Sequence, residues 1–285
     1  MSKIKGQFVC IDGEIVRTEN VLLSPENRAF KYGDGLFETI RSYNTKLLFF
    51  NEHLKRAKKG LDLLKIKYPA GFQEQIHSDI QKLLQTNKHF AGARVRVSFF
   101  RKDGGLYTPE NNDVSYLIET KELPSEIYEF RKKGIKLGIY NESKVQYNQF
   151  SGIKSLNTYP YILAGIYKNE NAFDDCLLYN TNTELCEAIS SNLFVVKDGY
   201  LFTPAIESGC VEGIMRETII ELALSMSIVV FDDAVIRENE ILNADEIFLT
   251  NAIEGIKWVV AYKNKRYYNK ISKKLYNALV KYVCA

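Results

Sequence analysis

The sequence predicts an α+β protein of two domains, and three observations lead to this prediction. The chain has 285 residues, roughly twice the ~150 residues of an ordinary domain. Short predicted strands and a few helices follow one another without the regular strand–helix alternation of a parallel α/β sheet. Residues Lys121–Arg131 are charged, contain Pro124 and show no clear periodicity, so we place a linker there. We therefore expect an N-terminal domain over residues 1–120 and a C-terminal domain over residues 132–285.

The predicted elements of the N-terminal domain begin with a hairpin. Phe8–Ile11 and Glu14–Arg17 flank Asp12-Gly13, a pair that favours a two-residue turn between strands. Leu47–Phe50 is expected to be a strand that leads into a helix, and Arg94–Phe100 alternates like a strand. Two helices are predicted from apolar residues three or four positions apart: Leu54, Ala57, Leu61 and Leu64 in the first, and Ile76, Ile80, Leu83 and Leu84 in the second, roughly Gln73–Gln85.

The C-terminal domain is predicted to be richer in strands. The expected strands are Lys136–Tyr140, Asp175–Tyr179, Ser191–Val196, Tyr200–Thr203, Ile228–Phe231 and Glu246–Thr250. Two helices are expected among them, at roughly Tyr159–Lys168 and Ile214–Ser225. No internal repeat is found.

Composition and charge exclude several classes of function. The 38 basic and 35 acidic side chains leave a net charge of +3, too small an excess to indicate a nucleic-acid or membrane-surface partner. The longest stretch without a charged side chain, Ser155–Tyr167, is shorter than the ~20 residues of a membrane-spanning helix. Met1–Gly6 is polar and begins no signal peptide. We therefore expect a cytoplasmic protein.

Cysteines and histidines give no metal site. The five cysteines form no C-x-x-C pair, and the three histidines add no zinc spacing. We expect all five cysteines to be buried as small hydrophobic residues. We also expect the three histidines to be solvated helix residues rather than catalysts. The residues concerned are Cys10, Cys176, Cys186, Cys210, Cys284, His53, His77 and His89.

Four local features could serve a small anionic cofactor, although each has an ordinary explanation when taken alone. Lys154 adjoins the longest uncharged segment, where a desolvated amine loses its proton readily and can form an imine. Taken alone, this position favours a solvated surface lysine. Glu187 lies among small apolar residues and can hold a pyridinium nitrogen or pair with a base. Gly209–Arg216 leads into a helix whose first N–H groups can bind a phosphate. Arg56, on the flank of a helix, suits bidentate phosphate binding.

Six motifs occur in a fixed order along the chain. They are Arg28-Ala-Phe-Lys-Tyr32-Gly33-Asp34-Gly35-Leu-Phe37-Glu38-Thr39-Ile-Arg41, His53-Leu-Lys-Arg56, Lys154-Ser-Leu-Asn157, Glu187-x4-Asn192-Leu-Phe194, Gly213-Ile-Met-Arg216 and Thr250-Asn251-Ala252. In this order they resemble the class IV pyridoxal-phosphate aminotransferases, a family that includes branched-chain and D-amino-acid transaminases and aminodeoxychorismate lyase. The resemblance covers about residues 5 to 261. It implies a smaller N-terminal α/β sandwich and a larger C-terminal pseudo-barrel that carries the lysine, with the cofactor between them.

The resemblance also implies roles for individual residues. Lys154 is expected to bind pyridoxal 5'-phosphate covalently and to move the Cα proton of the substrate. Glu187 is expected to face the pyridine nitrogen of the cofactor. The remaining assignments are Arg56, the backbone of Ile214 and Met215, and Asn251 for the phosphate, Tyr159 for the ring hydroxyl, and Tyr32, Phe37 and Arg96 for the substrate pocket.

The motifs slightly favour 4-amino-4-deoxychorismate lyase, which releases pyruvate and leaves 4-aminobenzoate, over a transaminase. Tyr159 instead resembles branched-chain transaminases, and Leu106 stands where lyases often carry a basic residue. A branched-chain or D-amino-acid transaminase using 2-oxoglutarate is therefore the alternative. The motifs that are more similar to the lyase are Phe37-Glu38-Thr39, Gly213-Ile-Met-Arg216 and Thr250-Asn251-Ala252.

A catalytically silent homologue is a third interpretation. The presence of both Lys154 and Glu187 argues against it, because a silent copy has no physical need for either residue. The resemblance further implies a homodimer. The expected ligands are small amino and keto acids, with no nucleic acid and no membrane as partners.

Overall fold

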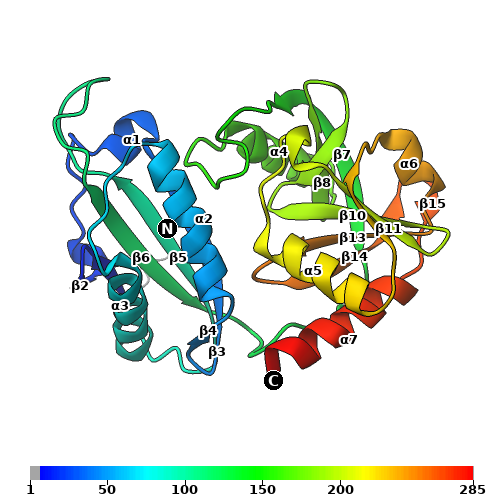
Figure 1. The fold of residues 1–285 in the computed structure, drawn as a ribbon, viewed down its shortest axis with the longest axis horizontal. Helices are drawn as coiled ribbons and strands as arrows, with labels where there is room; N and C mark the ends of the chain where they lie inside the picture. Colours follow the sequence, from blue (N-terminus) through cyan, green and yellow to red (C-terminus); the bar gives the residue numbers. More distant parts are fainter. Residues whose placement is uncertain (1–6, 285) are drawn as a thin grey trace. The chain divides into compact units, whose positions relative to one another are not determined.

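The computed structural model describes residues 7–284, and contacts divide the chain into two compact units (Figure 1). Unit 1 contains the described residues up to Ile127 together with Ile153–Asn157, and unit 2 contains Tyr128–Gly152 and the described residues from Thr158 onward. The boundary after Ile127 falls within the segment that we assigned as a linker. Lys154, which we assigned to the C-terminal domain, has its contacts in unit 1. The polar start Met1–Gly6 lies outside the described residues.

Unit 1 is built on a six-stranded sheet in the order β2-β1-β6-β5-β3-β4, in which every pair is antiparallel. The predicted hairpin is confirmed, and its turn residues Asp12 and Gly13 both have positive φ, as this turn type requires. The predicted strand Leu47–Phe50 is wrong beyond Leu47, because Phe49 adopts a left-handed conformation that starts a helix. The strands are β1 (Phe8–Ile11), β2 (Glu14–Arg17), β3 (Gly35–Tyr43), β4 (Lys46–Leu47), β5 (Gly92–Arg101) and β6 (Val114–Glu122).

The helices of unit 1 are α1 (Arg28–Tyr32), α2 (Phe50–Leu63) and α3 (Phe72–Thr86), with a short 3-10 turn at Thr18–Asn20. Helix α2 contacts β3, and α3 contacts β1 and β6 (Figure 1). Both longer helices were predicted from their apolar residues, and those residues are buried except Leu64, which is half-buried and caps the end of α2. The buried side chains are Leu54, Ala57 and Leu61 on α2 and Ile76, Ile80, Leu83 and Leu84 on α3.

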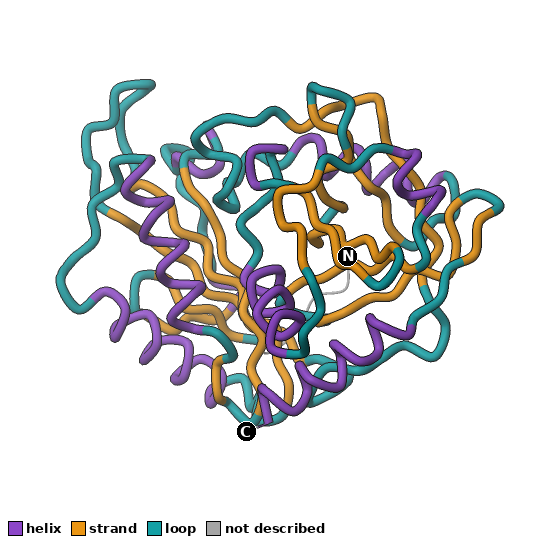
Figure 2. Tube along the Cα trace, turned by 45° about the vertical axis from the view of Figure 1, so that its right-hand side comes forward, coloured by secondary structure: helices purple, strands orange, loops and turns teal. Residues whose placement is uncertain are grey.

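Unit 2 contains a closed ring of strands (Figure 2). Its order is β10-β13-β14-β7-β8-β9, and β9 pairs again with β10, so that the ring has no open edge. The β7–β8 and β7–β14 pairs are parallel, β11 pairs with β10, and β15 pairs with β14. The predicted α+β fold with a pseudo-barrel is confirmed. The strands are β7 (Ile135–Val145), β8 (Asp175–Asn180), β9 (Leu185–Ala188), β10 (Ser191–Lys197), β11 (Tyr200–Pro204), β12 (Val230–Ala234), β13 (Glu246–Asn251), β14 (Gly255–Tyr262) and β15 (Lys265–Arg266).

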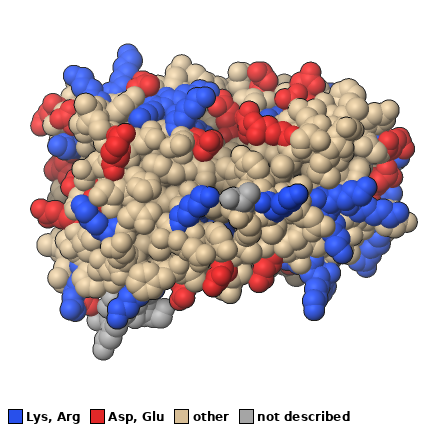
Figure 3. Space-filling view, turned by 60° about the horizontal axis from the view of Figure 1, so that its bottom comes forward, with Lys and Arg blue, Asp and Glu red and all other residues tan. Residues whose placement is uncertain are grey.

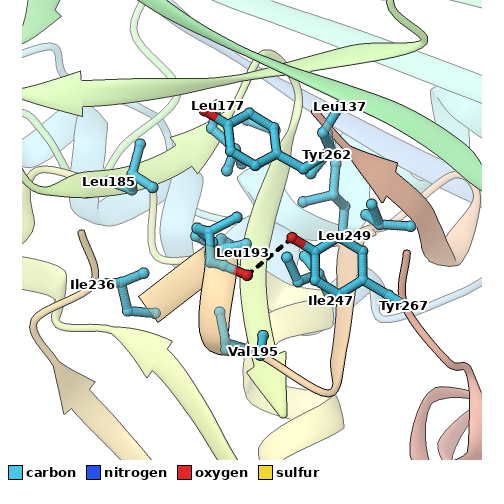
Figure 4. Close-up of a cluster of buried hydrophobic side chains, with 14 of the residues drawn as sticks. Leu137, Leu177, Leu185, Leu193, Val195, Ile236, Ile247, Leu249, Tyr262 and Tyr267 are labelled. Atoms are coloured by element: carbon cyan, nitrogen blue, oxygen red, sulfur yellow. Dashed lines mark hydrogen bonds between the residues drawn. The ribbon is translucent and has the colours of Figure 1, made fainter. Parts of the chain in front are cut away.

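All six strands of the ring contribute side chains to one hydrophobic cluster (Figure 4). Leu193 and Val195 on β10 are two residues apart and therefore point to the same face of the strand. Within the cluster, the hydroxyl of Tyr267 donates to the carbonyl oxygen of Ile241 at 2.9 Å. Burial raises the pKa of Tyr267, so the hydroxyl stays protonated and remains a donor. This packed interior gives unit 2 a rigid frame for the loops at its rim.

The helices of unit 2 are α4 (Tyr159–Glu170), α5 (Ile214–Ser225), α6 (Glu238–Asn243) and α7 (Lys270–Cys284), with a 3-10 turn at Ile206–Ser208. Helix α4 packs on β7 and β8, while α5 and α7 contact each other and β13. The predictions of α4 and α5 are confirmed. The predicted strand Ile228–Phe231 begins two residues too early, because the Ile228 N–H still bonds to the end of α5 at Ala223.

Three expectations about single residues are wrong. His89 is half-buried and lies in the loop after α3 rather than in a helix. Cys284 at the end of α7 is exposed, whereas the other four cysteines are buried as expected. His53 is not solvated but is 1% exposed, because its ring lies in the interior of unit 1.

Residues 7–284 contain neither a membrane-spanning helix nor a metal-binding group. None of their helices is both long enough and apolar enough to cross a bilayer. Their histidine, cysteine and acidic side chains form no group that can bind a metal ion. On the face drawn in Figure 3, basic and acidic side chains are interspersed.

Candidate active site

Lys154 is held by backbone hydrogen bonds to strand β3. The N–H of Phe37 donates to the carbonyl oxygen of Lys154 at 2.8 Å, and the N–H of Leu156 donates to the carbonyl oxygen of Gly35 at 3.1 Å. Ile153, the residue before the lysine, is 4% exposed and belongs to the core. The backbone on both sides of Lys154 is therefore fixed to the sheet of unit 1, and the lysine has a defined starting point for its side chain.

The aromatic ring of Phe37 brings three predicted residues together. The amine nitrogen of Lys154 lies 4.9 Å from the centre of this ring, and the guanidinium carbon of Arg96 lies 3.7 Å from it. Arg96 reaches the ring from the neighbouring strand β5, where it pairs with Thr39, two residues from Phe37. Burial, followed by the charge of Arg94, lowers the pKa of Arg96, but an arginine stays charged in a protein. One face of unit 1 thus combines a primary amine with a fixed cation.

Tyr32, the third residue predicted for the substrate pocket, belongs to a neighbouring group of contacts. Its ring lies 5.6 Å from that of Tyr107, and the guanidinium of Arg28 lies 5.0 Å from its centre. The next residue, Gly33, has a φ of 63°. A side chain there would also collide with Asn157, whose Oδ1 lies 2.9 Å from the position of a Cβ. Gly33 and Asn157, which belong to two of the quoted motifs, therefore pack directly against each other.

Arg56 is engaged by a buried glutamate. Its Nε donates to Glu38 Oε1 at 2.7 Å and its Nη2 donates to Glu38 Oε2 at 2.6 Å. The Nδ1 of His53 lies 2.7 Å from the same Oε2, so it must carry the proton and donate. The Nε2 of His53 is buried and has no hydrogen-bond partner among the described residues. A carboxylate from β3 thereby orients the arginine that the resemblance assigns to the phosphate.

The charge state of Glu38 follows from this arrangement. Burial on its own would raise the pKa of the Glu38 carboxyl, but the charge of Arg56 and the hydrogen bond from His53 outweigh it and hold the pKa at about 2. Glu38 is therefore ionised at every physiological pH, and its charge offsets that of Arg56.

In unit 2, Glu187 on β9 is 3% exposed and accepts two hydrogen bonds from neutral donors. The hydroxyl of Tyr161 on α4 donates to Oε1 at 2.6 Å, and the N–H of Val211 donates to Oε2 at 3.1 Å. The carboxylate is thereby oriented by two elements distant in sequence. A buried, oriented carboxylate of this kind can hold a positively charged nitrogen in place.

The first turn of α5 presents backbone donors. Gly213 caps the helix without any side-chain hydrogen bond, and Ile214 and Met215 are the first two helical residues. Gly213 is required here, because a Cβ would collide with the Oδ1 of Asn192. Asn192 in turn donates to the carbonyl oxygen of Val211 at 2.9 Å. The first N–H groups of a helix have no partner within the helix, so this end suits an anion.

The side-chain amide of Asn251 makes hydrogen bonds that stabilise the turn after β13. Its Oδ1 accepts from the N–H groups of Ile253 at 3.0 Å and Glu254 at 2.7 Å, and its Nδ2 donates to Ser191 at 3.0 Å. The residue shapes the end of β13, and a phosphate contact at this position would therefore fall to the backbone.

Tyr159 and Tyr161 differ sharply in their surroundings. Tyr159, which the resemblance assigns to the ring hydroxyl of the cofactor, is 74% exposed at the start of α4. Tyr161, which sequence reasoning did not select, makes the hydrogen bond to Glu187. Helical spacing offers a signal for this choice, since Tyr161 lies three residues before the fully buried Ala164.

Glu38 and His53 were also missed as functional candidates. Both lie inside the quoted motifs, but nothing local marks either as buried. His53 precedes Arg56 by three positions on α2, so the two side chains share a helix face. This spacing of His53 and Arg56, together with Glu38 on β3, could have indicated that the three side chains interact.

The chain is similar in sequence to a known enzyme family and to several of its characterised relatives. A family model described as amino-transferase class IV matches residues 35–262. Three relatives are branched-chain-amino-acid aminotransferase 3 of Arabidopsis thaliana (28% identical, 97% of this chain and 71% of that protein), D-alanine aminotransferase of Listeria monocytogenes (26%, 85% and 83%) and aminodeoxychorismate lyase of Vibrio harveyi (27%, 81% and 83%).

Solved structures share the fold. Branched-chain amino acid aminotransferase of Escherichia coli superimposes with a TM-score of 0.86 at 22% identity, covering 96% of this chain and 94% of that one. Another branched-chain amino acid aminotransferase, solved with pyridoxamine 5'-phosphate, gives a TM-score of 0.84 at 23% identity, with 97% and 94% covered.

Glu38→Gln is expected to destabilise the protein by about 3–5 kcal/mol at neutral pH, because it leaves the charge of Arg56 buried without a balancing carboxylate. The folded-state pKa of Glu38 is about 2 against an ordinary value of 4.5. Its stabilising effect is therefore complete above pH 4.5 and is lost as the pH falls toward 2. Urea unfolding of both proteins at neutral and acidic pH measures the difference, which should shrink in acid.

The matched control is Glu122→Gln, which changes an exposed glutamate at the end of β6. It should alter the free energy of unfolding by no more than about 0.5 kcal/mol. A destabilisation by Glu38→Gln that is as small as that of the control would contradict the account.

Proposed function

Because the chain belongs to the class IV amino-transferase family, whose enzymes depend on pyridoxal phosphate, we propose that Lys154 binds this cofactor and that the enzyme acts on a carbon bearing an amino group. The observation that carries the proposal is the cluster around Phe37. There the amine of Lys154 lies beside the ring that also contacts the guanidinium of Arg96. An amine beside a fixed cation suits a substrate that carries both an amino group and a carboxylate.

The residues present fit the cofactor at each of its polar groups. The aldehyde needs a primary amine, which Lys154 offers. The pyridine nitrogen needs a buried acceptor, and Glu187 is 3% exposed and oriented by two donors. The phosphate needs donors, and the first turn of α5 presents N–H groups with no side-chain cap.

Each residue then has a separate task. Bound pyridoxal phosphate supplies an electron sink for the bonds at the amino-bearing carbon. Lys154 bonds to the cofactor and afterwards moves the proton at the substrate carbon. Glu187 holds a proton at the ring nitrogen, and Arg96 binds a substrate carboxylate. Arg56, oriented by Glu38, donates a hydrogen bond to the phosphate.

For the reaction itself, we propose 4-amino-4-deoxychorismate lyase activity, giving 4-aminobenzoate and pyruvate. The Thr250-Asn251-Ala252 run supports this choice, because it is one of the motifs that are more similar to the lyase. The side chain of Asn251 also organises the turn that follows β13. The similarity to the Vibrio harveyi aminodeoxychorismate lyase, 27% over 234 residues, is consistent with it. In this reaction Lys154 removes the proton from the amino-bearing ring carbon, and the ring becomes aromatic when the C–O bond to the enolpyruvyl group breaks as well. The released enolpyruvate takes up a proton and becomes pyruvate.

The second candidate is an amino-acid transaminase that uses 2-oxoglutarate. It is favoured by Leu106, which is 70% exposed in the segment where lyases often carry a basic residue. The similarities to a branched-chain and a D-alanine aminotransferase also support it.

We further propose a homodimer that works in the cytoplasm. Helix α4 has a stripe of exposed apolar side chains on one face, and such a stripe is usually covered by a partner. Its members are Tyr159, Ile162, Leu163 and Ile166, exposed by 74%, 54%, 44% and 50%. A second copy of the chain is the proposed partner.

Borohydride reduction of the protein after incubation with pyridoxal phosphate is expected to leave a stable adduct on Lys154, because reduction fixes the imine between amine and aldehyde. Peptide mass spectrometry locates the adduct. Lys154→Ala should abolish it, whereas Lys144→Ala, which removes an exposed lysine of β7, should not. An adduct confined to another lysine would refute the assignment of Lys154.

The holoenzyme is expected to convert aminodeoxychorismate into 4-aminobenzoate faster than it transfers amino groups from leucine or D-alanine to 2-oxoglutarate. Chromatography of the aromatic product and a coupled keto-acid assay measure the two rates. Arg96→Gln should raise the KM for the preferred substrate by about tenfold or more, because a charge-assisted hydrogen bond to the carboxylate is lost. Rapid keto-acid formation without 4-aminobenzoate would decide for the transaminase.

The double substitution Ile162→Lys and Ile166→Lys is expected to dissociate the dimer, because it places charges in the apolar stripe. Light scattering coupled to gel filtration should then give a mass near 32.7 kDa instead of about twice that value. Leu224→Lys is the control, since this side chain is 57% exposed on α5 outside the stripe. A wild-type mass near 32.7 kDa would rule out the dimer.

A further inference from the structure

We propose that Tyr161 is a positioning residue of the enzyme, which aims the carboxylate of Glu187 so that it can hold the proton on the ring nitrogen of the cofactor. This proposal rests on the proposed function, because it takes Glu187 as the partner of that nitrogen. The hydrogen bond itself lies wholly within unit 2.

The geometry gives Tyr161 a defined donor role. Its hydroxyl lies 2.6 Å from Oε1 of Glu187, within the range for a hydroxyl that donates to a carboxylate. Helix α4 brings it there by packing on β7 and β8, next to the strand that carries Glu187. The second oxygen, Oε2, is fixed by the N–H of Val211. Two donors on different oxygens restrict rotation of the carboxylate.

The hydroxyl remains a donor under all physiological conditions. Burial, followed by the charge of Glu187, raises the pKa of Tyr161 far above its ordinary value. Donors of this kind favour the charged form of a carboxylate. Since Tyr161 and Val211 are both neutral donors, they orient the carboxylate without cancelling its negative charge.

The contrast with Glu38 supports this interpretation. Glu38 is bound by the guanidinium of Arg56 in a bidentate pair, so that its charge is balanced inside the protein. The hydrogen bond from Tyr161 to Glu187 instead orients a carboxylate without bringing a positive charge. The two buried glutamates are therefore oriented by different kinds of donor, a guanidinium at Glu38 and a phenol hydroxyl at Glu187.

The surroundings of Glu187 add no competing anion from the neighbouring thiols. Burial, followed by the charge of Glu187, raises the pKa of Cys210 to about 12. The pKa of Cys186 is also raised well above its ordinary value, for the same two reasons in the same order. Both thiols stay protonated, so the negative charge at this place belongs to Glu187.

The experiment compares two ligands with the purified apoenzyme. One is pyridoxal phosphate, and the other is its carbocyclic analogue, in which a C–H group replaces the ring nitrogen. Tyr161→Phe should raise the dissociation constant of pyridoxal phosphate about tenfold, because a hydrogen bond to a charged group is lost. The dissociation constant of the analogue should change by less than about twofold, since it has no nitrogen for Glu187 to hold.

Two controls accompany this comparison. Tyr167→Phe removes a hydroxyl from the same helix, where the ring packs on Tyr140 and Phe173, and should affect neither ligand. In a Glu187→Gln background, Tyr161→Phe should no longer distinguish the two ligands, because the carboxylate that it orients is gone.

Each outcome has a distinct meaning. Equal losses of affinity for both ligands, or no loss for either, would overturn the role of Tyr161 while leaving the cofactor assignment intact. Failure of the wild-type protein to bind pyridoxal phosphate, with no adduct on Lys154, would overturn the proposed function itself.

If Tyr161→Phe does not fold, 3-fluorotyrosine introduced at position 161 provides a second test. Fluorination makes the hydroxyl a stronger donor without changing the shape of the side chain greatly. It should change the affinity for pyridoxal phosphate but not for the analogue. Parallel behaviour of the two ligands would again overturn the proposal.

Discussion

The attachment of Ile153–Asn157 to strand β3 is the constraint on which the candidate site depends. This segment leaves unit 2 in sequence but makes its contacts in unit 1, where Phe37 donates to the carbonyl oxygen of Lys154. The same strand carries Phe37, whose ring contacts Lys154 and Arg96, and Glu38, which orients Arg56. Alternation along β3 sends these neighbouring side chains to opposite faces of the sheet. One strand thereby holds the amine and Arg96 on one face of the sheet and orients Arg56 on the other.

The two buried glutamates show how burial and partner together determine what a carboxylate can do. The charge of Glu38 is balanced by Arg56, and its pKa is about 2. Its role is therefore to orient the arginine. Glu187 is oriented by the hydroxyl of Tyr161 and the N–H of Val211, both neutral. The proposed cofactor would meet these glutamates in different ways, through Arg56 at its phosphate and through Glu187 itself at its ring nitrogen.

Much of the fold could be predicted from the sequence, because hydrophobic spacing and turn residues act locally. The hairpin at Asp12-Gly13 and the apolar stripes of α2 and α3 are examples. Helix α7 was missed, although its buried residues Leu275 and Leu279 are four positions apart, a spacing like the one that predicted α2. The site was harder. Motif order made Lys154 and Glu187 candidates, and the resemblance added Arg96, but the hydrogen bonds of His53 to Glu38 and of Tyr161 to Glu187 join elements distant in sequence and depend on tertiary packing.

The central claim is that Lys154 and Glu187 serve the same molecule of pyridoxal phosphate. A crystal structure of the protein with this cofactor tests the claim most directly. The account predicts continuous density from Nζ of Lys154 to the cofactor and a carboxylate oxygen of Glu187 within hydrogen-bonding distance of the ring nitrogen. A cofactor joined to another lysine, or a ring nitrogen that faces another group, would contradict it.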